Sequence, residues 1–371
     1  AVQELTLPAI AEALIERHRA GVTVKLVLEN NYSAPWSLQH PAGLEPHQQK
    51  RLRRLQKLGW RDAIALLQRA GVPLLDDTAD GSAGSGLMHH KFVVIDRQRV
   101  LTGSANFTSS GLHGDAGQAS SRGNVNHLLQ LESPELAELF AEEFEQLWGD
   151  GPGGMPARRF GLGEHSRRLQ RAHLGSDHAS VLFAPHRRNN PDHGLALIRQ
   201  QLEQAQRSID LALFVFSAQE LADVLALKRD QGVQIRVLVD PGFAHRSYSE
   251  WLDLKGLAMA DHRCRLEAGN NPWATPLKTV GTPRLSRGDK LHHKFAVIDG
   301  QTVITGSFNW SPAAAHTNDE TLLVIDSPTL AAHFSREMDR LWQSAELGIT
   351  PRLQRKLERS QRLCGQSQIA D

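Results

Sequence analysis

Apolar positions along the chain follow two spacings, and the same order of spacings occurs twice. Residues three and four apart are apolar over 9–20 and again over 221–230, which predicts two amphipathic helices, each ending at a glycine. Each helix precedes a segment rich in β-branched residues, 22–28 or 233–239, as expected of a buried strand. Both halves of the chain therefore begin with a helix followed by a strand.

The rest of each half continues the parallel. Short apolar segments at 92–95 and 295–298 predict one pair of strands, and 128–131 and 322–325 predict another. A Ser-Pro pair then starts a helix in each half, with serine as the N-cap and proline in the first turn. Helices alternating with buried strands predict the α/β class: two α/β sandwich domains, each a mixed β-sheet flanked by helices.

Direct comparison of the two halves indicates an internal duplication. Residues 88–107 (MHHKFVVIDRQRVLTGSANF) and 291–310 (LHHKFAVIDGQTVITGSFNW) are identical at 13 of 20 positions. We expect a first domain at 1–148, a basic linker at 149–179, a second domain at 180–343 and a polar basic tail at 344–371. At an offset of 211, residues 1–5 align with the second half of an apolar strand. The first domain is therefore expected to lack the start of that strand. A targeting signal would lie in the missing part, so the sequence does not indicate the cellular compartment.

Composition excludes several classes of protein. The chain has 371 residues, 40% of them hydrophobic, with 42 Lys and Arg against 41 Asp and Glu. It is too apolar for a disordered chain, and its apolar runs are far shorter than the roughly 18 residues of a membrane span. Two cysteines are too few for a disulfide framework or a multi-cysteine zinc site.

The duplicated segment carries the candidate chemistry, in the pattern H-x-K-x4-D-x6-G-S-x-N. A histidine and a lysine two residues apart on a strand point to the same side, which suits a phosphate group. Serine and asparagine on the following loop add neutral donors. Displacement at phosphorus through a covalent intermediate needs a nucleophile and a proton donor, so we expect the two motifs to face each other and share one site. Their members are His89, Lys91, Asp96, Ser104 and Asn106, and His292, Lys294, Asp299, Ser307 and Asn309.

Two complete copies of this motif resemble the signature of the phospholipase D superfamily, over about residues 1–148 and 181–343. The resemblance implies a phosphodiesterase that uses no metal or other cofactor, in which one motif histidine attacks phosphorus and forms a phosphohistidine. It also implies phosphate contacts for the motif lysines and asparagines, together with Ser104 and Ser307. The motif aspartates, Asp96 and Asp299, are expected to support the site from behind.

One pair of positions departs from the repeat. The family often has an acidic residue downstream that bonds a motif histidine; Glu320 occupies that place in the second half, whereas the first half has Asn126. A carboxylate raises the pKa of its imidazole, and an amide orients the ring without charge. We therefore expect His292, backed by Glu320, to be the general acid and His89 the nucleophile. The reverse stays open, because a carboxylate would also stabilise a cationic phosphohistidine.

The remaining histidines give no further site. His90 and His293 face the opposite side of their strands from the motif residues, so we expect buried structural imidazoles. None of the 18 histidines has the spacing of a metal-ligand pair such as H-x3-H, and we predict no catalytic metal.

The substrate is left between two classes. The second motif looks most like the branch that contains bacterial endonucleases and mitochondrial cardiolipin hydrolase. We expect a phospholipid to be hydrolysed or transferred; the alternative is a metal-independent endonuclease acting on single-stranded DNA or RNA. A binding protein with a dead site is disfavoured because both motifs are intact. One chain holds both half-sites, so a monomer suffices and no protein partner is required.

Three basic stretches could follow a nucleic-acid backbone or an anionic membrane surface. The first lies in an acid-free segment, the second in the linker and the third in the tail. Their members are Lys50, Arg51, Arg53, Arg54, Lys57 and Arg61; Arg158, Arg159, Arg167, Arg168 and Arg171; and Arg352, Arg355, Lys356, Arg359 and Arg362.

Overall fold

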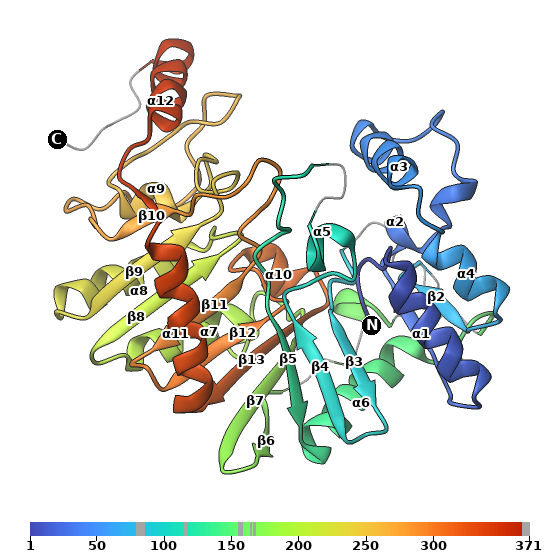
Figure 1. The fold of residues 1–371 in the computed structure, drawn as a ribbon. Coiled ribbons are helices and arrows are strands. Elements are labelled where there is room, and N and C mark those ends of the chain that lie inside the picture. Colours follow the sequence, from blue (N-terminus) through green and yellow to red (C-terminus); the bar gives the residue numbers. More distant parts are fainter. Residues whose placement is uncertain (79–85, 115–117, 155–158, 164, 166–167, 366–371) are drawn as a thin grey trace.

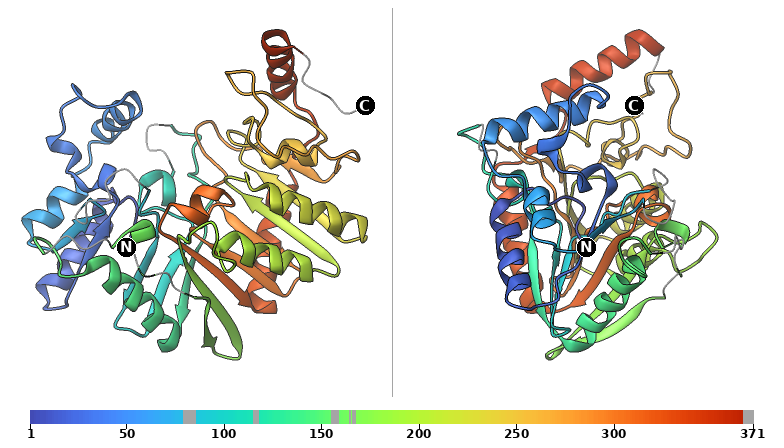
Figure 2. Two further views of the ribbon diagram at one scale, coloured as in Figure 1. Left: turned by 180° about the vertical axis from the view of Figure 1, so that it is seen from behind. Right: turned by 90° about the vertical axis from the view of Figure 1, so that its right-hand side faces the viewer.

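The computed structural model describes residues 1–78, 86–114, 118–154, 159–163, 165 and 168–365. It confirms the α/β class: strands of both halves lie side by side through the middle of the molecule, and helices cover them outside (Figures 1 and 2). No described helix has both the length and the apolar composition needed to cross a bilayer. Two of the expected linker arginines, Arg158 and Arg167, lie outside the described residues.

The second half is built on a nine-stranded mixed sheet. The strands β8, β9 and β10 pair in parallel, and every other neighbouring pair in this sheet is antiparallel. The order across the sheet is β14 (Glu346–Leu347), β10 (Val280–Thr282), β9 (Gln234–Val239), β8 (Ser208–Leu213), β11 (Lys294–Ile298), β12 (Thr302–Gly306), β13 (Glu320–Asp326), β7 (Asp177–Ala184) and β6 (Gln170–Leu174).

The first half repeats this order, with strands equal to or shorter than their equivalents. It has a parallel pair, β1 (Leu26–Leu28) with β2 (Leu74–Asp76), and an antiparallel sheet of β3 (Phe92–Ile95), β4 (Arg99–Gly103) and β5 (Leu128–Glu132). Val2 forms bridges to both Leu28 and Lys91 and so joins the two sheets. In the second half, Leu213 of β8 pairs in the same way with β9 and β11, as the offset of 211 predicts.

The helices begin and end where local chemistry favours it. The predicted Ser-Pro starts are confirmed: Ser133 Oγ accepts the N–H of Leu136 at 3.1 Å, and Ser327 Oγ accepts that of Leu330 at 3.2 Å. The α-helices are α1 (Pro8–Arg19), α2 (Asn30–Ser33), α3 (Pro46–Leu58), α4 (Ala63–Arg69), α5 (Ser109–Leu112), α6 (Pro134–Trp148), α7 (Gly194–Gln204), α8 (Gln219–Asp230), α9 (Glu250–Leu254), α10 (Pro312–His316), α11 (Pro328–Trp342) and α12 (Pro351–Cys364); 3-10 turns occupy Trp36–Leu38 and Gly161–Gly163.

One hydrophobic cluster belongs to both halves. Phe92 and Phe140 of the first half pack with Phe183 and Ile325 of the second in the same group of buried residues. The ring of Phe140 meets those of Phe92 and Phe183 edge-on, at centroid distances of 5.1 and 5.2 Å. The two halves therefore share part of their core.

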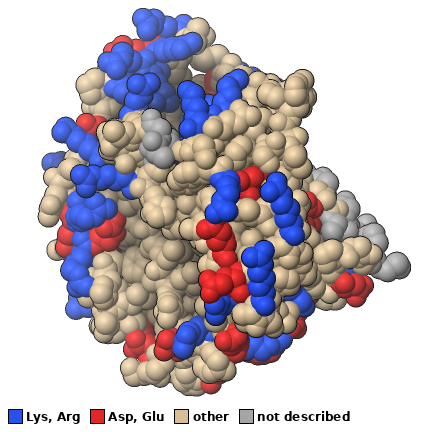
Figure 3. Space-filling model, turned by 45° about the vertical axis from the view of Figure 1, so that its right-hand side comes forward, with Lys and Arg blue, Asp and Glu red and all other residues tan. Residues whose placement is uncertain are grey.

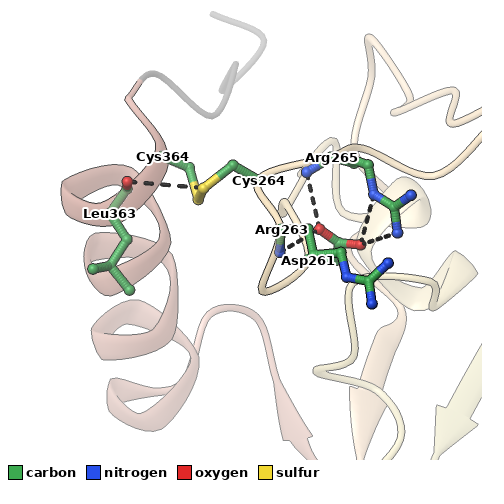
Figure 4. Close-up of a disulfide and its surroundings, with 6 residues drawn as sticks. All are labelled: Asp261, Arg263, Cys264, Arg265, Leu363 and Cys364. Carbon is green, nitrogen blue, oxygen red and sulfur yellow. Dashed lines mark hydrogen bonds and ion pairs between the residues drawn. A yellow bond between two sulfur atoms is a disulfide. The ribbon is translucent and has the colours of Figure 1, made fainter.

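The segments expected as linker and tail contain regular structure. Residues 170–174 and the first residues of β7 form an edge hairpin of the large sheet, although they lie in the expected linker. In the expected tail, β14 pairs with β10, and α12 buries Leu353 and Leu357. A single disulfide, Cys264–Cys364, joins the end of α12 to the loop before β10 (Figure 4). Residues 170–179 and 346–364 thus add structure to the second half, whereas Phe160 of the expected linker packs with Val27 and Trp148 of the first half.

Candidate active site

The two motif strands contact the opposite half of the chain through equivalent hydrogen bonds. The backbone N–H of His89 donates to the carbonyl of Asp319 at 3.0 Å, and that of His292 donates to the carbonyl of Val125 at 2.9 Å. A parallel β-bridge accompanies each of these contacts. Because each contact is made twice with the halves exchanged, a pseudo-two-fold axis relates the motifs.

Each motif histidine is held by a residue of the other half. His89 Nδ1 lies 2.8 Å from Glu320 Oε2, and His292 Nδ1 lies 2.9 Å from Asn126 Oδ1. The expected pairing of His292 with Glu320 within the second half is therefore wrong. The start of β13 runs beside the first motif, so the side chain of Glu320 reaches across the axis instead of back into its own half.

These contacts set the tautomer of both rings. A carboxylate or amide oxygen accepts but does not donate, and the NH2 group of Asn126 is directed at the carbonyls of Gly111 and Asn124. Each Nδ1 therefore carries a proton, which leaves the lone pair of a neutral ring on Nε2. In both motifs Nε2 is the atom available to attack phosphorus or to carry a transferable proton.

The motif lysines are buried beside the histidines, each with 1% of its surface exposed. Lys91 Nζ donates to the backbone oxygen of His89 at 2.7 Å, and Lys294 Nζ donates to that of His292 at 2.9 Å. Burial lowers the pKa of Lys91 to about 7, opposed by the charges of Glu320 and Glu4. Burial and the charge of Lys91 hold the pKa of Lys294 well below its usual value. Because both lysines are buried close together, an anion bound between them would favour their charged forms.

The pKa values of both catalytic candidates are lowered, which favours neutral imidazoles at pH 7. Burial lowers the pKa of His89 to about 4, although the charge of Glu320 opposes this shift. Burial and the charges of Lys294, Lys91 and His89 hold the pKa of His292 well below its usual value. Since groups of each half act on the other, the four side chains face one common space.

The motif serines lie behind the histidines. Ser104 Oγ donates to Asn126 Oδ1 at 2.9 Å, and Ser307 Oγ donates to Glu320 Oε2 at 2.6 Å. Both serines are fully buried, and they fix the residues that orient the opposite histidine. Their expected contact with substrate stays a prediction.

The motif asparagines retain unused acceptors. Asn106 Nδ2 donates to Gln3 Oε1 at 3.1 Å. The Oδ1 atoms of Asn106 and Asn309 are buried and have no hydrogen-bond partner within the described part of the chain. Phosphate contact through these amides also stays a prediction.

The motif aspartates lie in turns at the far ends of the motif strands. Asp96 and Asp299 have φ values of 51° and 54°. The carboxylate of Asp299 accepts the backbone N–H groups of Gln206, Arg207 and Ser208, which anchors the start of β8. Asp299 therefore supports the sheet that carries the second motif.

The second histidine of each motif is structural, as predicted. His90 is fully buried, with its ring nitrogens 2.8 Å from Thr321 Oγ1 and 3.2 Å from Glu143 Oε1. His293 lies 3.1 Å from Glu337 Oε1 and 3.0 Å from the ring of His127. The contacts of His90 with Thr321 and of His293 with His127 also cross between the halves.

Two site residues outside the motifs were missed by the sequence analysis. Gln3 Oε1 accepts from Lys91 Nζ at 3.3 Å as well as from Asn106. At the equivalent position of the second half, the ring of Phe214 lies 4.6 Å from that of His292 and 5.1 Å from Lys294 Nζ. The offset of 211 aligns Gln3 with Phe214, so alignment of the two halves could have identified both as equivalent site positions.

Metal-binding geometry is absent from the described residues: no three His, Cys, Asp or Glu side chains gather where they could hold an ion. The charges that face the site come instead from the two lysines and Glu320.

Comparisons with known proteins agree with the motifs. A family model described as "Cardiolipin synthase, PLD-like domain" matches residues 1–148 and 198–342. A mitochondrial cardiolipin hydrolase of Xenopus tropicalis is 34% identical over 146 residues, 38% of this chain and 58% of that protein. One of Chlamydomonas reinhardtii is 28% identical over 141 residues, 38% of this chain and 54% of that protein. The chain thus spans between half and two thirds of these relatives.

A solved structure shares the whole fold. The phosphatidylserine synthase of Haemophilus influenzae superposes with a TM-score of 0.55 and 12% identity, covering 98% of this chain and 95% of that one. The family model covers most of both halves, and each half carries a complete motif. The chain belongs to the phospholipase D superfamily.

Proposed function

We propose that this chain is a phosphodiesterase that cleaves a phospholipid through a covalent phosphohistidine. The observation that carries the proposal is the pair of imidazoles, each with Nδ1 fixed by the opposite half and a buried lysine beside it. One ring can attack phosphorus while the other donates a proton, which is the division of labour that a double displacement needs.

His89 is the nucleophile in this proposal. Its Nε2 forms a bond to phosphorus, the bond from phosphorus to the leaving oxygen breaks, and His292 Nε2–H gives its proton to that oxygen. His292 then takes a proton from water or an alcohol, whose oxygen attacks phosphorus and releases His89. Lys91 and Lys294 balance the charge on the non-bridging oxygens, and the NH2 groups of Asn106 and Asn309 donate hydrogen bonds to them.

The contact of His89 with Glu320 supports this assignment. A ring protonated at Nδ1 and phosphorylated at Nε2 is cationic, so a carboxylate 2.8 Å from Nδ1 stabilises it. An amide at the same place, as beside His292, gives no such charge. The bound phosphate, as an anion between two lysines, raises the pKa of His292 and lets it start protonated.

The adduct identifies the nucleophile directly. We expect an acid-sensitive phosphatidyl adduct, linked through phosphorus to His89, when turnover is quenched within milliseconds and the peptides are analysed by mass spectrometry. The matched variants are His89→Asn, which should give no adduct, and His292→Asn, which should form the adduct slowly without the acid and release it slowly without the base. Phosphate on His292 in the native chain would reverse the assignment.

A phospholipid is the favoured substrate because the relatives are named cardiolipin hydrolases and the family model is named for cardiolipin synthase. The test incubates the protein in EDTA with cardiolipin vesicles, phosphatidylcholine vesicles, single-stranded DNA and RNA in parallel. We expect phosphatidic acid or a transferred phosphatidyl group from the lipid, and none from the His89→Asn/His292→Asn variant. Cleaved strands with intact lipid would instead make the chain an endonuclease.

A further inference from the structure

A cationic cavity lies beside the catalytic site, between α3 and the loop that follows the first motif. It has a volume of about 240 Å³. At about 30 Å³ for each water molecule, this is room for a phosphate group and part of its ester. We call it the α3 pocket; its lining includes Tyr32, His47, Lys50, Arg51, Arg54 and Thr108.

Glu4 links the pocket to the motif lysine of the first half. Glu4, which lines the pocket, accepts a hydrogen bond from Arg51 at 2.8 Å, and its charge also acts on Lys91. The preceding residue, Gln3, bonds both Lys91 and Asn106. Thr108, also in the lining, comes two residues after Asn106. A ligand that spans the two places would therefore cross only the Gln3–Glu4 segment.

The charge of the pocket is positive. Arg51 neutralises Glu4 and lies over the ring of Tyr32, 4.9 Å from its centroid. Lys50, Arg54 and His47 also line the pocket, and Glu4 is the one acidic side chain among the described residues of the lining. Lys and Arg side chains gather at the upper end of the molecule in Figure 3, the end at which both α12 and α3 lie in Figure 1. An anion is the ligand that such a lining favours.

The pocket breaks the symmetry of the site. In the first half, the segment between β1 and β2 carries the basic helix α3. The corresponding segment of the second half, between β9 and β10, carries α9 with buried Glu250 and Asp253. Two equivalent motifs hold one phosphate between them, so a cationic pocket on one side distinguishes the two ends of a substrate.

We propose that the α3 pocket binds the second phosphate of a phospholipid that carries two, as cardiolipin does, while the first lies between the motifs. This inference rests on the proposed function, because it places a second group of the same substrate. Lipids with one phosphate would leave the pocket empty and be poorer substrates.

The test compares two double variants of one helix. Lys50→Gln/Arg54→Gln removes two cations from the pocket; Arg53→Gln/Lys57→Gln removes two exposed cations of α3 that do not line it. Both are assayed on cardiolipin and on phosphatidylglycerol in vesicles of equal surface charge. We expect the pocket variant to lose about tenfold in kcat/KM on cardiolipin, a typical effect of charge-assisted contacts, and little on phosphatidylglycerol. The control variant should change neither.

A binding measurement separates this inference from the proposed function. Calorimetry with glycerol 1,3-bisphosphate and glycerol 3-phosphate needs no turnover. We expect the bisphosphate to bind about tenfold more tightly, and the difference to disappear in the pocket variant alone. Equal binding of the two probes, equal losses in both variants, or a two-phosphate preference seen only with oligonucleotides would overturn the inference. Absence of turnover with this binding difference intact would overturn the catalytic proposal instead.

Discussion

At the residue scale, the two motifs are alike in sequence but differ in the group behind each histidine. His89 faces a carboxylate and His292 an amide, although both motifs carry the same histidine, lysine, serine and asparagine. The difference lies outside the motifs, at Glu320 and Asn126. In the proposed mechanism, this difference gives the two rings distinct chemical roles.

Replacing Glu320 by glutamine tests this division. The charge of Glu320 raises the pKa of His89, so its removal lowers that pKa and moves the acidic limb of the kcat profile to lower pH. We expect kcat itself to fall by about 10- to 100-fold, because a charge-assisted hydrogen bond to the cationic ring is lost. Steady-state kinetics across pH 3–9 measure both effects.

The reciprocal change provides the control. Asn126→Asp places a carboxylate behind His292 and raises its pKa, so a general acid there stays protonated to higher pH. The basic limb of the profile should move upward while the acidic limb stays in place. Movement of the opposite limb by each variant would show that the two histidines have exchanged roles.

At the element scale, α9 carries a buried carboxyl group, that of Glu250, which the folded state accommodates in its protonated, neutral form. Glu250 is 2% exposed, and burial with the nearby charges of Asp253, Glu267 and Asp223 raises its pKa to about 9. The folded state therefore holds a proton that the unfolded chain releases near pH 4.5. The stability associated with this proton is complete below pH 4.5 and is lost as the pH rises towards 9.

Glu250→Gln should remove that pH dependence. We expect the variant and the native chain to have the same free energy of unfolding at pH 4, and the variant to be more stable by up to about 3 kcal/mol at pH 7. Denaturant unfolding at both pH values measures the difference. A difference that does not change with pH would contradict the buried, protonated carboxyl.

The helix α12 depends on a covalent link for its position. It buries only Leu353 and Leu357, and the disulfide to Cys264 closes a loop of 100 residues. We expect the Cys264→Ser/Cys364→Ser variant to lose hydrogen-exchange protection in α12 while the motif strands β3 and β11 keep theirs. Activity should stay within about twofold, because α12 holds no catalytic group; a large loss would show that it does.

Patterns of neighbouring residues predict a helix or strand only where interactions within that segment determine its structure. The helical spacing at 9–20 and 221–230 matches α1 and α8, and the Ser-Pro pairs start α6 and α11. The strand β14 and the hairpin of β6 and β7 were not predicted. They form because β10 and β13 offer free edges, which no local pattern reveals.

At the scale of the whole molecule, the site exists because the halves dock. The motif residues follow from the repeat, but the partner of each histidine depends on which strand ends meet across the axis. The same crossing joins His90 to Thr321 and His293 to His127. Sequence comparison within one half places Glu320 beside His292; docking places it beside His89. That step lies beyond any pattern in a single half.

A chain cut between the halves tests whether both are needed. A protease site inserted after Gly153, whose surroundings leave open space, would yield fragments 1–153 and 154–371. The shared cluster around Phe92, Phe140 and Phe183 should keep the cut chain together on gel filtration, with activity within about twofold of the uncut chain.

The fragments can also be separated in denaturant and refolded alone. Each fragment then lacks the residue that orients its histidine and should be inactive; mixing the two fragments should restore turnover. Activity of the fragment 154–371 alone would mean that two second halves can supply each other's Glu320, and the first half would then be needed for the α3 pocket rather than for chemistry.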